Sequence, residues 1–364
     1  MHGQKMRTLE SGKITVFNRA FDVYGYSDDT WYQDVKSKGV WQEFRLANLA
    51  YFVGPNDICL DLGANVGMMT LALAMLAPKG HVYAFEGSPE TTAALQQTIK
   101  GNGLTNVDAF NYVMGRGAEK VKFFDMPDVR SSGHYVPASN DRQTTSLWQD
   151  TSQVLQYETK SIDGLVEELN IPRVDFIKID VEGAELDVLA GAKKTLEKFH
   201  PIVVMEFNSY ALMHLREIPP RRALKEIFEI FEEVYYFKSR TEALVRLENT
   251  ERSRERFLHD NLFGGFADDL LCTFKGAELV KLGLAAQNTE DNLRAEIAKR
   301  DIEVMNLKGG IADLSRVVGE LEENLMQCRA LSSATERMLR DQLNSIHQSR
   351  SWRITAPLRA LKGG

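Results

Sequence analysis

Cysteine is scarce in this sequence: Cys59, Cys272 and Cys328 are the only three among 364 residues, and they lie far apart. Disulfide-stapled domains and zinc sites need several cysteines at short spacings, so neither is indicated. Long apolar runs are missing too, since no stretch approaches the roughly 18 uninterrupted apolar residues of a membrane span. The first residues, MHGQKMRTLESGK, have no apolar core of a signal peptide. We therefore expect a cytoplasmic protein without a transmembrane segment.

An excess of basic residues is also lacking. Lys and Arg together number 44 against 51 Asp and Glu, which gives a formal net charge of -7. Proteins that bind nucleic acids neutralise phosphates with an excess of Lys and Arg, so nucleic acid is not expected as a partner. With 43% hydrophobic residues, the chain can bury one substantial core and still carry an appendage.

Short apolar runs alternate with amphipathic segments over residues 51–278. The candidate strands are DICLDL, HVYAFE, NVDAFNY, VDFIKID and PIVVMEF, and the helical patterns between them are MMTLALAML, PETTAALQQTIKGNG and AELDVLAGAKKTLEKF. Such alternation is typical of a mostly parallel sheet covered on both faces. After a helix near residues 221–231, VYYFK and DLLCTFK indicate an antiparallel pair. We predict a doubly wound, Rossmann-like α/β domain, preceded in residues 1–50 by lead-in helices and a strand.

The C-terminal part of the chain has a different pattern. β-branched residues recur at seven-residue steps, and three of them are followed three residues later by Leu: Ile297, Val304, Ile311, Val318, Leu307, Leu314 and Leu321. β-branched residues at one core position with Leu at the other favour a parallel two-stranded coiled coil. We predict a coiled coil over residues 285–348 that makes the protein a homo-oligomer. Trimers, and a single helix packed on the domain, remain alternatives.

The first predicted strand leads into a turn with an acid and two glycines. A dinucleotide-binding turn reads G-x-G-x-x-G, and its second glycine lets the backbone approach a pyrophosphate. Here Asn65 takes that second place and Gly67 comes one position early, which disfavours a nicotinamide cofactor. The turn suits a ligand with an amino-acid end instead, because Gly63 lets the chain pass close and Asp61 can meet an ammonium group through water or backbone.

Glu86 ends the second predicted strand, 25 residues after Asp61. Its carboxylate can accept two hydrogen bonds from a ribose diol, as the acid of dinucleotide folds does. Taken singly, Gly63 and Gly67 are explained by tight-turn packing and Glu86 by a surface position. Together, at the carboxyl ends of adjacent strands, these residues predict S-adenosylmethionine and a class I methyltransferase, with a nicotinamide oxidoreductase as a more distant alternative.

Two motifs make this prediction more specific. They are D-x-G-A-N-x-G at residues 61–67 and D-V-E-G-x-E at residues 180–185. In this order they resemble the FkbM family of S-adenosylmethionine-dependent O-methyltransferases, and the resemblance covers roughly residues 40–275. Further matches are FEGSPE at 85–90, NYVMGRGAEKVKFF at 111–124, TKSIDGLVEE at 159–168, and Trp41 with Glu43. The resemblance implies methyl transfer to a hydroxyl, commonly on sugars, polyketides or similar natural products.

The predicted cofactor-binding residues come from these matched segments. They are Asp61, Gly63, Ala64, Asn65, Gly67, Glu86, Gly87, Ser88, Asn111, Tyr112 and Asp180. Asp180 would end the fourth strand, which lies beside the first strand in this topology and therefore near the reactive methyl group.

Asp180 and Glu182 are the predicted catalytic residues, which position or deprotonate the acceptor hydroxyl. Glu185 is explained almost equally well as an acid that complements a helix N-terminus. The polar residues 126–155 break the strand and helix pattern and predict either an active-site lid or a disordered insertion. His134 lies in that segment and is the candidate base, since an unperturbed pKa of about 6.5 suits proton transfer.

A metal site is the alternative that the sequence leaves open. Catechol-type methyltransferases bind Mg²⁺ at the ends of the fourth and fifth strands, and Asp180, Glu206 and Asn208 occupy similar places here. Oxygen ligands suit this ion. Because the spacing is loose and Glu206 can bond backbone groups at the strand end, we expect a site without metal.

The last residues, SRSWRITAPLRALKGG at 349–364, resemble a segment S-W-R-x-T-x-P-L-R that follows coiled coils in many bacterial glycosyltransferases and glycan-assembly proteins. The basic side chains and Trp352 suit docking on an anionic surface or a partner enzyme, whereas a disordered basic end is the plainer explanation. The resemblance implies a sugar acceptor in surface polysaccharide or lipopolysaccharide synthesis. It also implies glycosyltransferase partners, through which the protein would sit at the inner membrane. The competing function is a methyltransferase-like coiled-coil scaffold with weak or no catalysis.

Overall fold

The computed structural model describes residues 8–41, 49–50, 52–125, 133–137, 153–237, 244–264 and 267–274, and the separate helical positions 315, 318, 319, 326 and 340. The chain divides into two units, Met1–Ala285 and Ala286–Gly364. Apart from those five positions, the predicted coiled coil lies outside the described residues, as does the whole basic tail. Both stay predictions.

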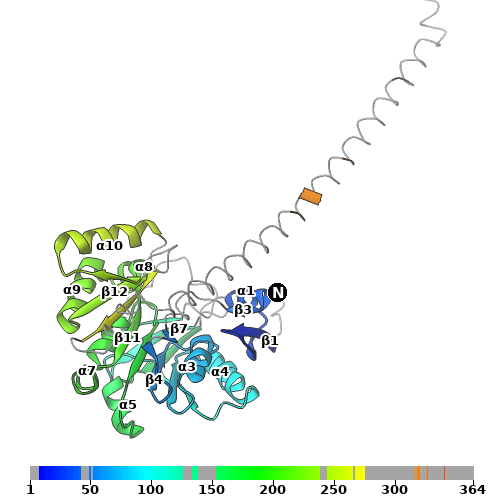
Figure 1. The fold of residues 1–364 in the computed structure, drawn as a ribbon, viewed down its shortest axis with the longest axis horizontal. Helices are drawn as coiled ribbons and strands as arrows, with labels where there is room; N and C mark the ends of the chain where they lie inside the picture. The colour runs from blue at the N-terminus through cyan, green and yellow to red at the C-terminus, as the bar shows by residue number, and fades with distance from the viewer. Residues whose placement is uncertain are drawn as a thin grey trace, which may run out of the picture. The chain divides into compact units, whose positions relative to one another are not determined.

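A sheet of eight strands forms the centre of the first unit (Figure 1). The strands are β4 (Ile58–Leu62), β5 (His81–Glu86), β6 (Val107–Asn111), β10 (Phe176–Ile179), β11 (Ile202–Asn208), β12 (Glu233–Phe237), β13 (Leu244–Leu247) and β14 (Ala267–Thr273). Their order is β13-β12-β14-β11-β10-β4-β5-β6. The strands from β11 to β6 pair in parallel, and β14 pairs antiparallel with β11 and β12. The predicted mostly parallel sheet with an antiparallel last strand is confirmed.

Helices cover both faces of this sheet. Neighbouring residues of one strand point to opposite faces, and accordingly Cys59 packs in one core and Leu60 in the other. The helices on the Cys59 side are α3 (Met68–Leu76) and α4 (Pro89–Gly101). Those on the Leu60 side are α5 (Ile162–Glu168), α6 (Glu185–Ala190), α7 (Lys193–Phe199), α8 (Ser209–His214), α9 (Pro220–Ile230) and α10 (Glu251–Gly264).

The helix predicted over residues 184–199 is divided into α6 and α7. The chain turns at Gly191, where an added Cβ would lie 2.3 Å from the carbonyl oxygen of Gly115. The Asp163 carboxylate then accepts hydrogen bonds from the N–H groups of Lys194 and Thr195, at 3.0 and 2.8 Å, and so caps the start of α7. These contacts link residues distant in sequence, so the periodicity of the segment could not reveal the break.

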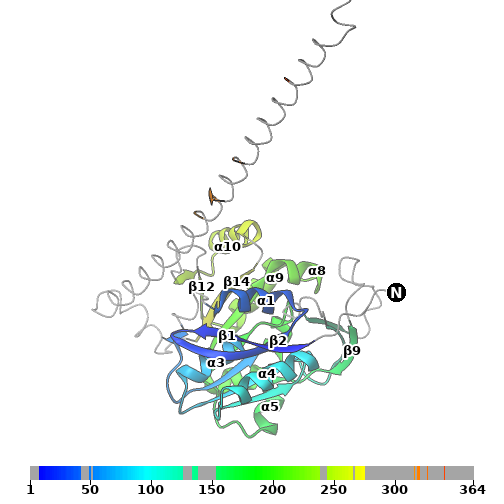
Figure 2. The same ribbon diagram turned by 90° about the vertical axis from the view of Figure 1, so that its right-hand side faces the viewer.

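A small sheet built from the N-terminal residues packs on the Cys59 side. It contains β1 (Leu9–Val16), β2 (Arg19–Tyr26) and the short β3 (Val40–Trp41), with α1 (Thr30–Lys38) between β2 and β3. Figure 2 shows β1 and β2 running across α3 and α4. The backbone N–H of Tyr24 donates to the Thr98 hydroxyl of α4 at 3.0 Å. The lead-in region therefore includes a β-hairpin that the sequence reading did not anticipate.

A second small sheet contains part of the polar segment at residues 126–155. Its strands are β7 (Lys120–Asp125), β8 (His134–Pro137) and β9 (Gln153–Glu158), in the antiparallel order β8-β7-β9. Residues 126–132 and 138–152 lie outside the described part. His134 thus lies in a strand paired with β7 rather than in an irregular loop.

The connection between β12 and β14 is more structured than the sequence suggested. It contains β13 and the 14-residue helix α10, in addition to residues outside the described ranges. Within the described part of the chain, no helix has the length and apolar character needed to cross a bilayer.

Candidate functional site

A cavity of about 310 Å³ opens where β4 and β10 end. These two strands are neighbours, but the chain continues from β4 to β5 and β6 on one side and from β10 to β11 on the other. Ligands of open α/β sheets bind at such a reversal of strand order. Of the residues predicted from the sequence, those that line the cavity are Asp61, Gly63, Ala64, Asn65, Glu86, Gly87, Tyr112, His134, Asp180, Glu182 and Glu206.

The glycines of the first motif shape the turn after β4. Gly63 has a φ of 79°, and a Cβ added there would lie 1.7 Å from the carbonyl oxygen of Asp180. Only glycine therefore allows β4 and β10 to end side by side. Gly67 has a φ of 100° and precedes α3, where an added Cβ would lie 2.6 Å from Leu95. Gly67 therefore allows the turn to pack closely against Leu95 of α4.

Asp61 is a buried carboxylate at the end of β4. Its Oδ2 atom accepts a hydrogen bond from the Thr70 hydroxyl of α3 at 2.6 Å. Burial raises the pKa of Asp61 to about 6, while Thr70 and the nearby Lys178 oppose that rise. A residue of α3, the helix that follows β4, therefore fixes the Asp61 side chain. In the pairing of β4 with β10, Asp61 lies directly opposite Lys178.

Glu86 ends β5 and is held by backbone groups on both carboxylate oxygens. The N–H of Asn65 donates to Oε2 at 2.9 Å, and the N–H of Ser88 donates to Oε1 at 2.8 Å. Burial raises the pKa of Glu86 to about 7, and these hydrogen bonds counteract part of the rise. Since each carboxylate oxygen has two acceptor sites, the group retains capacity for a ligand hydroxyl.

Ser88 and Asn111 support this region without lining the cavity. The Ser88 hydroxyl caps α4 by accepting from the Thr91 N–H at 3.2 Å. The Asn111 side-chain amide donates to the carbonyl oxygens of Glu86 and Gly87, both at 2.9 Å. Tyr112, the next residue, does line the cavity. These contacts hold the segment after β5 in place.

Asp180, Glu182 and Glu206 form an acidic cluster in which one carboxylate oxygen of each residue lies within 4.8 Å of the others. Glu182 has a φ of 52°, an unfavourable conformation for a residue other than glycine. Burial and the charge of Asp180 raise the pKa values of Glu182 and Glu206 well above the ordinary range of a carboxyl group. Strained residues and raised pKa values are typical of functional sites.

Lys178 is a site residue that the sequence reading missed. It lies in β10 with only 3% of its surface exposed and lines the cavity. Its Nζ atom lies 3.1 Å from Oδ2 of Asp180 and 3.7 Å from Oδ1 of Asp269 in β14. The sequence did indicate this residue, since Lys178 interrupts the apolar strand FIKID. Lysine is rarely buried in a strand unless it has a charged partner.

Glu185 and Asn208 have structural roles close to the site. Oε1 of Glu185 accepts hydrogen bonds from the N–H groups of Val181 and Gly183, at 3.2 and 3.1 Å, and so closes the turn before α6. Oδ1 of Asn208 accepts from the Ala211 N–H at 3.0 Å and caps α8. Asn208 is not among the residues that line the cavity.

Aromatic residues form another part of the cavity lining, named here the aromatic wall. His134 of β8 is 6% exposed and stacks on Phe124 with the ring centroids 5.3 Å apart. Tyr135 and Phe123 come from the same small sheet, and Trp31 and Trp41 come from the N-terminal region. Trp41 and Phe123 belong to segments of the family resemblance, whereas Trp31 and Tyr135 belong to no motif that would have indicated them in the sequence.

Comparison with known proteins shows which proteins this chain resembles. Residues 61–237 match the family described as the methyltransferase FkbM domain. The chain is 27% identical over 203 residues to 2-O-methyltransferase NoeI of Sinorhizobium fredii, covering 54% of this chain and 81% of that protein. It is 30% identical over 148 residues to Methyltransferase 1 of Beauveria bassiana, covering 38% and 59%.

A third relative is the hexuronic acid methyltransferase AglP of Haloferax volcanii, 26% identical over 149 residues, which make up 41% of this chain and 55% of that protein. The chain thus spans a little over half the length of this relative and of the Beauveria protein. The matched family region begins at Asp61 and includes both sequence motifs and the acidic cluster. This protein is therefore a methyltransferase, and its residues 61–237 are similar to the methyltransferase FkbM domain.

Proposed function

We propose that this protein transfers a methyl group from S-adenosylmethionine to a hydroxyl of a sugar in bacterial surface-glycan synthesis. The observation that carries the proposal is that Glu86 and the acidic cluster line one cavity. A group suited to a ribose and groups suited to an acceptor hydroxyl thus face the same space. The names of two relatives, a 2-O-methyltransferase and a hexuronic acid methyltransferase, support transfer to oxygen and a sugar acceptor.

The residues around the cavity fit S-adenosylmethionine. Glu86 would accept hydrogen bonds from the ribose diol, and the turn at Gly63, Ala64 and Asn65 would face the amino-acid end. When bound, the cofactor supplies a methyl group on a positively charged sulfur. The acidic lining complements that charge, because opposite charges at short range attract strongly in a partly buried site.

Glu182 and Glu206 are suited to take the proton of the acceptor hydroxyl. A base works best when its pKa lies close to the working pH, and burial moves the pKa values of both carboxyl groups in that direction. Asp180 and Glu182 would also accept a hydrogen bond from the hydroxyl and orient its oxygen, and such positioning supplies much of the rate of a displacement reaction. His134, on the aromatic wall, is the alternative base.

The reaction needs no metal in this proposal. Asp180, Glu182 and Glu206 are oxygen ligands of the kind that Mg²⁺ prefers. However, the Lys178 ammonium group lies 3.1 Å from Asp180 and already supplies positive charge to the cluster. Chelation with EDTA should therefore leave the rate unchanged.

The coiled coil and tail extend the proposal beyond the catalytic domain. Residues 285–348 would join copies of the chain, and the tail would dock on glycosyltransferases. The protein would then act in the cytoplasm, beside partner enzymes at the inner membrane. The heptad pattern and the tail motif support this part of the proposal.

The test is transfer of tritium from S-adenosyl-L-[methyl-³H]methionine to methyl glycosides of neutral hexoses, 6-deoxyhexoses and hexuronic acids. We expect label in one class of sugar, with and without EDTA. Asp180→Asn should abolish transfer, whereas Arg221→Met, which breaks an exposed ion pair with Glu255, should not. A folded protein that binds the cofactor but labels no sugar would contradict the proposal and favour the scaffold.

A further inference from the structure

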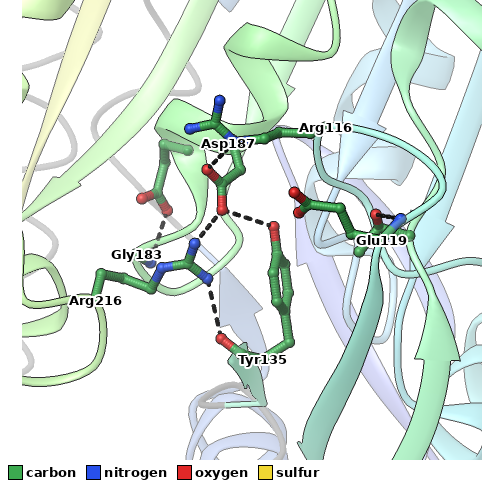
Figure 3. A network of polar contacts seen from close by, with 8 residues as sticks. Arg116, Glu119, Tyr135, Gly183, Asp187 and Arg216 are labelled. Atoms are coloured by element: carbon green, nitrogen blue, oxygen red, sulfur yellow. Dashed lines mark hydrogen bonds and ion pairs between the residues drawn. The ribbon is translucent and has the colours of Figure 1, made fainter. Parts of the chain in front are cut away.

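Asp187 of α6 is buried and is the centre of a network of polar contacts that includes Tyr135, a residue that lines the cavity (Figure 3). Its Oδ1 atom accepts from Nε of Arg116 at 2.9 Å. Its Oδ2 atom accepts from the Tyr135 hydroxyl at 3.2 Å and also from Nη2 of Arg216. One carboxylate therefore joins four segments that lie far apart in the sequence.

Arg216 connects this network to β8 in three ways. Its Nη1 atom donates to the carbonyl oxygen of Tyr135 at 3.1 Å, and its guanidinium lies 4.8 Å from the centre of the Tyr135 ring. The third link runs through Asp187. The Arg216 side chain is only 8% exposed, and its Cγ atom lies so close to Gly183 that an added Cβ there would be 3.2 Å away. Arg216 thus touches both the D-V-E-G turn and β8.

The small sheet of β7, β8 and β9 is connected to two turns of the cavity lining, one after β5 and one after β10. At one end, the Phe123 ring of β7 lies against Gly87, where an added Cβ would be 2.7 Å away. At the other end, Arg216 and Asp187 hold β8 beside Gly183. β8 is the edge strand of this sheet, with β7 on its paired side. In the described part of the chain, Tyr135 of β8 is also hydrogen-bonded to Arg216 and Asp187.

We propose that Arg216 and Asp187 are positioning residues. They hold β8 so that His134 and Tyr135, which belong to the aromatic wall of the cavity, contact the acceptor. This inference rests on the proposed function. Neither residue lines the cavity, so they act through β8. The alternative is that the network only stabilises the fold.

Two substitutions separate these roles. In Arg216→Lys the charge beside Asp187 remains, but a single ammonium group cannot reproduce the fork that bonds both Asp187 and the Tyr135 carbonyl. Tyr135→Phe removes only the bond from the hydroxyl to Asp187 and keeps the main-chain contact of Arg216. Arg221→Met is the matched control, because its ion pair with Glu255 is exposed.

Hydrogen exchange of the peptide that contains residues 134–137 reports whether β8 stays in place, and calorimetry gives the affinity for S-adenosylmethionine. For Arg216→Lys we expect faster exchange in that peptide alone, with cofactor affinity unchanged. With the sugar that the wild-type protein labels best, the acceptor KM should rise about tenfold, as expected for a small misplacement of the binding wall. Tyr135→Phe should have a smaller effect, and Arg221→Met none.

Unchanged exchange at β8 in Arg216→Lys would overturn the inference. So would a loss of cofactor affinity parallel to the rise in acceptor KM, since that pattern indicates general destabilisation. If the wild-type protein labels no sugar, the proposed function fails. The exchange and calorimetric measurements still decide whether Arg216 positions β8.

Discussion

The Nζ atom of Lys178 lies 3.1 Å from Oδ2 of Asp180, and both residues line the cavity at the end of β10. Lys178 is a buried cation among carboxylates that line the cavity, including Asp61, Glu182 and Glu206. Burial raises the pKa values of these three carboxyl groups, and the charge of Lys178 opposes the rise in each case. Lys178 therefore favours the ionised form of these three carboxyl groups.

Lys178→Met should shift the pH dependence of methyl transfer. Without the ammonium charge, the pKa values of Glu182 and Glu206 rise further, so the base stays protonated up to a higher pH. The acid limb of the pH profile of kcat/KM should move to higher pH, and the rate at pH 7 should fall by about 10²-fold. Lys225→Met, which affects an exposed pair with Glu229, should leave the profile unchanged. An unshifted acid limb in Lys178→Met would exclude this role.

Gly63→Ala should prevent stable folding of the domain. The added Cβ would overlap the Asp180 carbonyl, and backbone atoms on both strands cannot move apart without breaking the sheet. We expect a loss of more than about 4 kcal/mol in chemical denaturation. Gly103 also has a positive φ, of 63°, but an added Cβ meets nothing within 4 Å. Gly103→Ala should cost only about 1 kcal/mol, and equal costs for the two variants would disprove the steric argument.

Glu185→Gln should change how stability depends on pH. Burial raises the pKa of Glu185 to about 7, so in the wild-type protein its contribution to stability is fully present below the unfolded pKa of about 4.3 and is lost as the pH rises to about 7. The amide oxygen of Gln can accept the same two N–H bonds without the charge. Between pH 4.5 and 8, wild-type stability should fall relative to the variant by up to about 3 kcal/mol.

Denaturation curves at several pH values measure this difference. A constant difference between the two proteins over that range would mean that Glu185 is ionised as easily in the folded state as in the unfolded state.

Truncation after Leu284 should separate self-association from cofactor binding. If residues 285–348 form a coiled coil, the shortened protein should be a smaller species in light scattering. Its affinity for S-adenosylmethionine should equal that of the full chain, because every predicted cofactor residue precedes the cut. A full-length protein that is already monomeric would refute the coiled-coil prediction.

The pattern of apolar residues along the sequence was sufficient to predict the main sheet. The strands β4, β5, β10 and β11 are short apolar runs because both of their faces are buried, and α3 occupies the segment MMTLALAML as predicted. The two motifs identified the turns after β4 and β10, and the structure brings them to one cavity. Such features depend on neighbouring residues and are therefore visible in a single sequence.

Contacts between distant segments could not be predicted in this way. Arg216 and Asp187 belong to no motif, and their roles exist only because β8 folds against α6. Lys178 was visible as a charge in an apolar strand, but its partner Asp269 is supplied by β14, 91 residues later. Likewise, Asn208 has the residue type of a metal ligand, and only the structure shows that it caps α8.

The most direct test of the account is calorimetric titration of the full chain with S-adenosylmethionine, beside NADH as the control. The wild-type protein should bind S-adenosylmethionine and not NADH. Glu86→Ala should weaken that binding by about 1.5 to 3 kcal/mol, since a charged acceptor for the ribose diol is lost. Unchanged affinity in Glu86→Ala would remove Glu86 from the site, and binding of NADH alone would contradict the assignment of the cofactor.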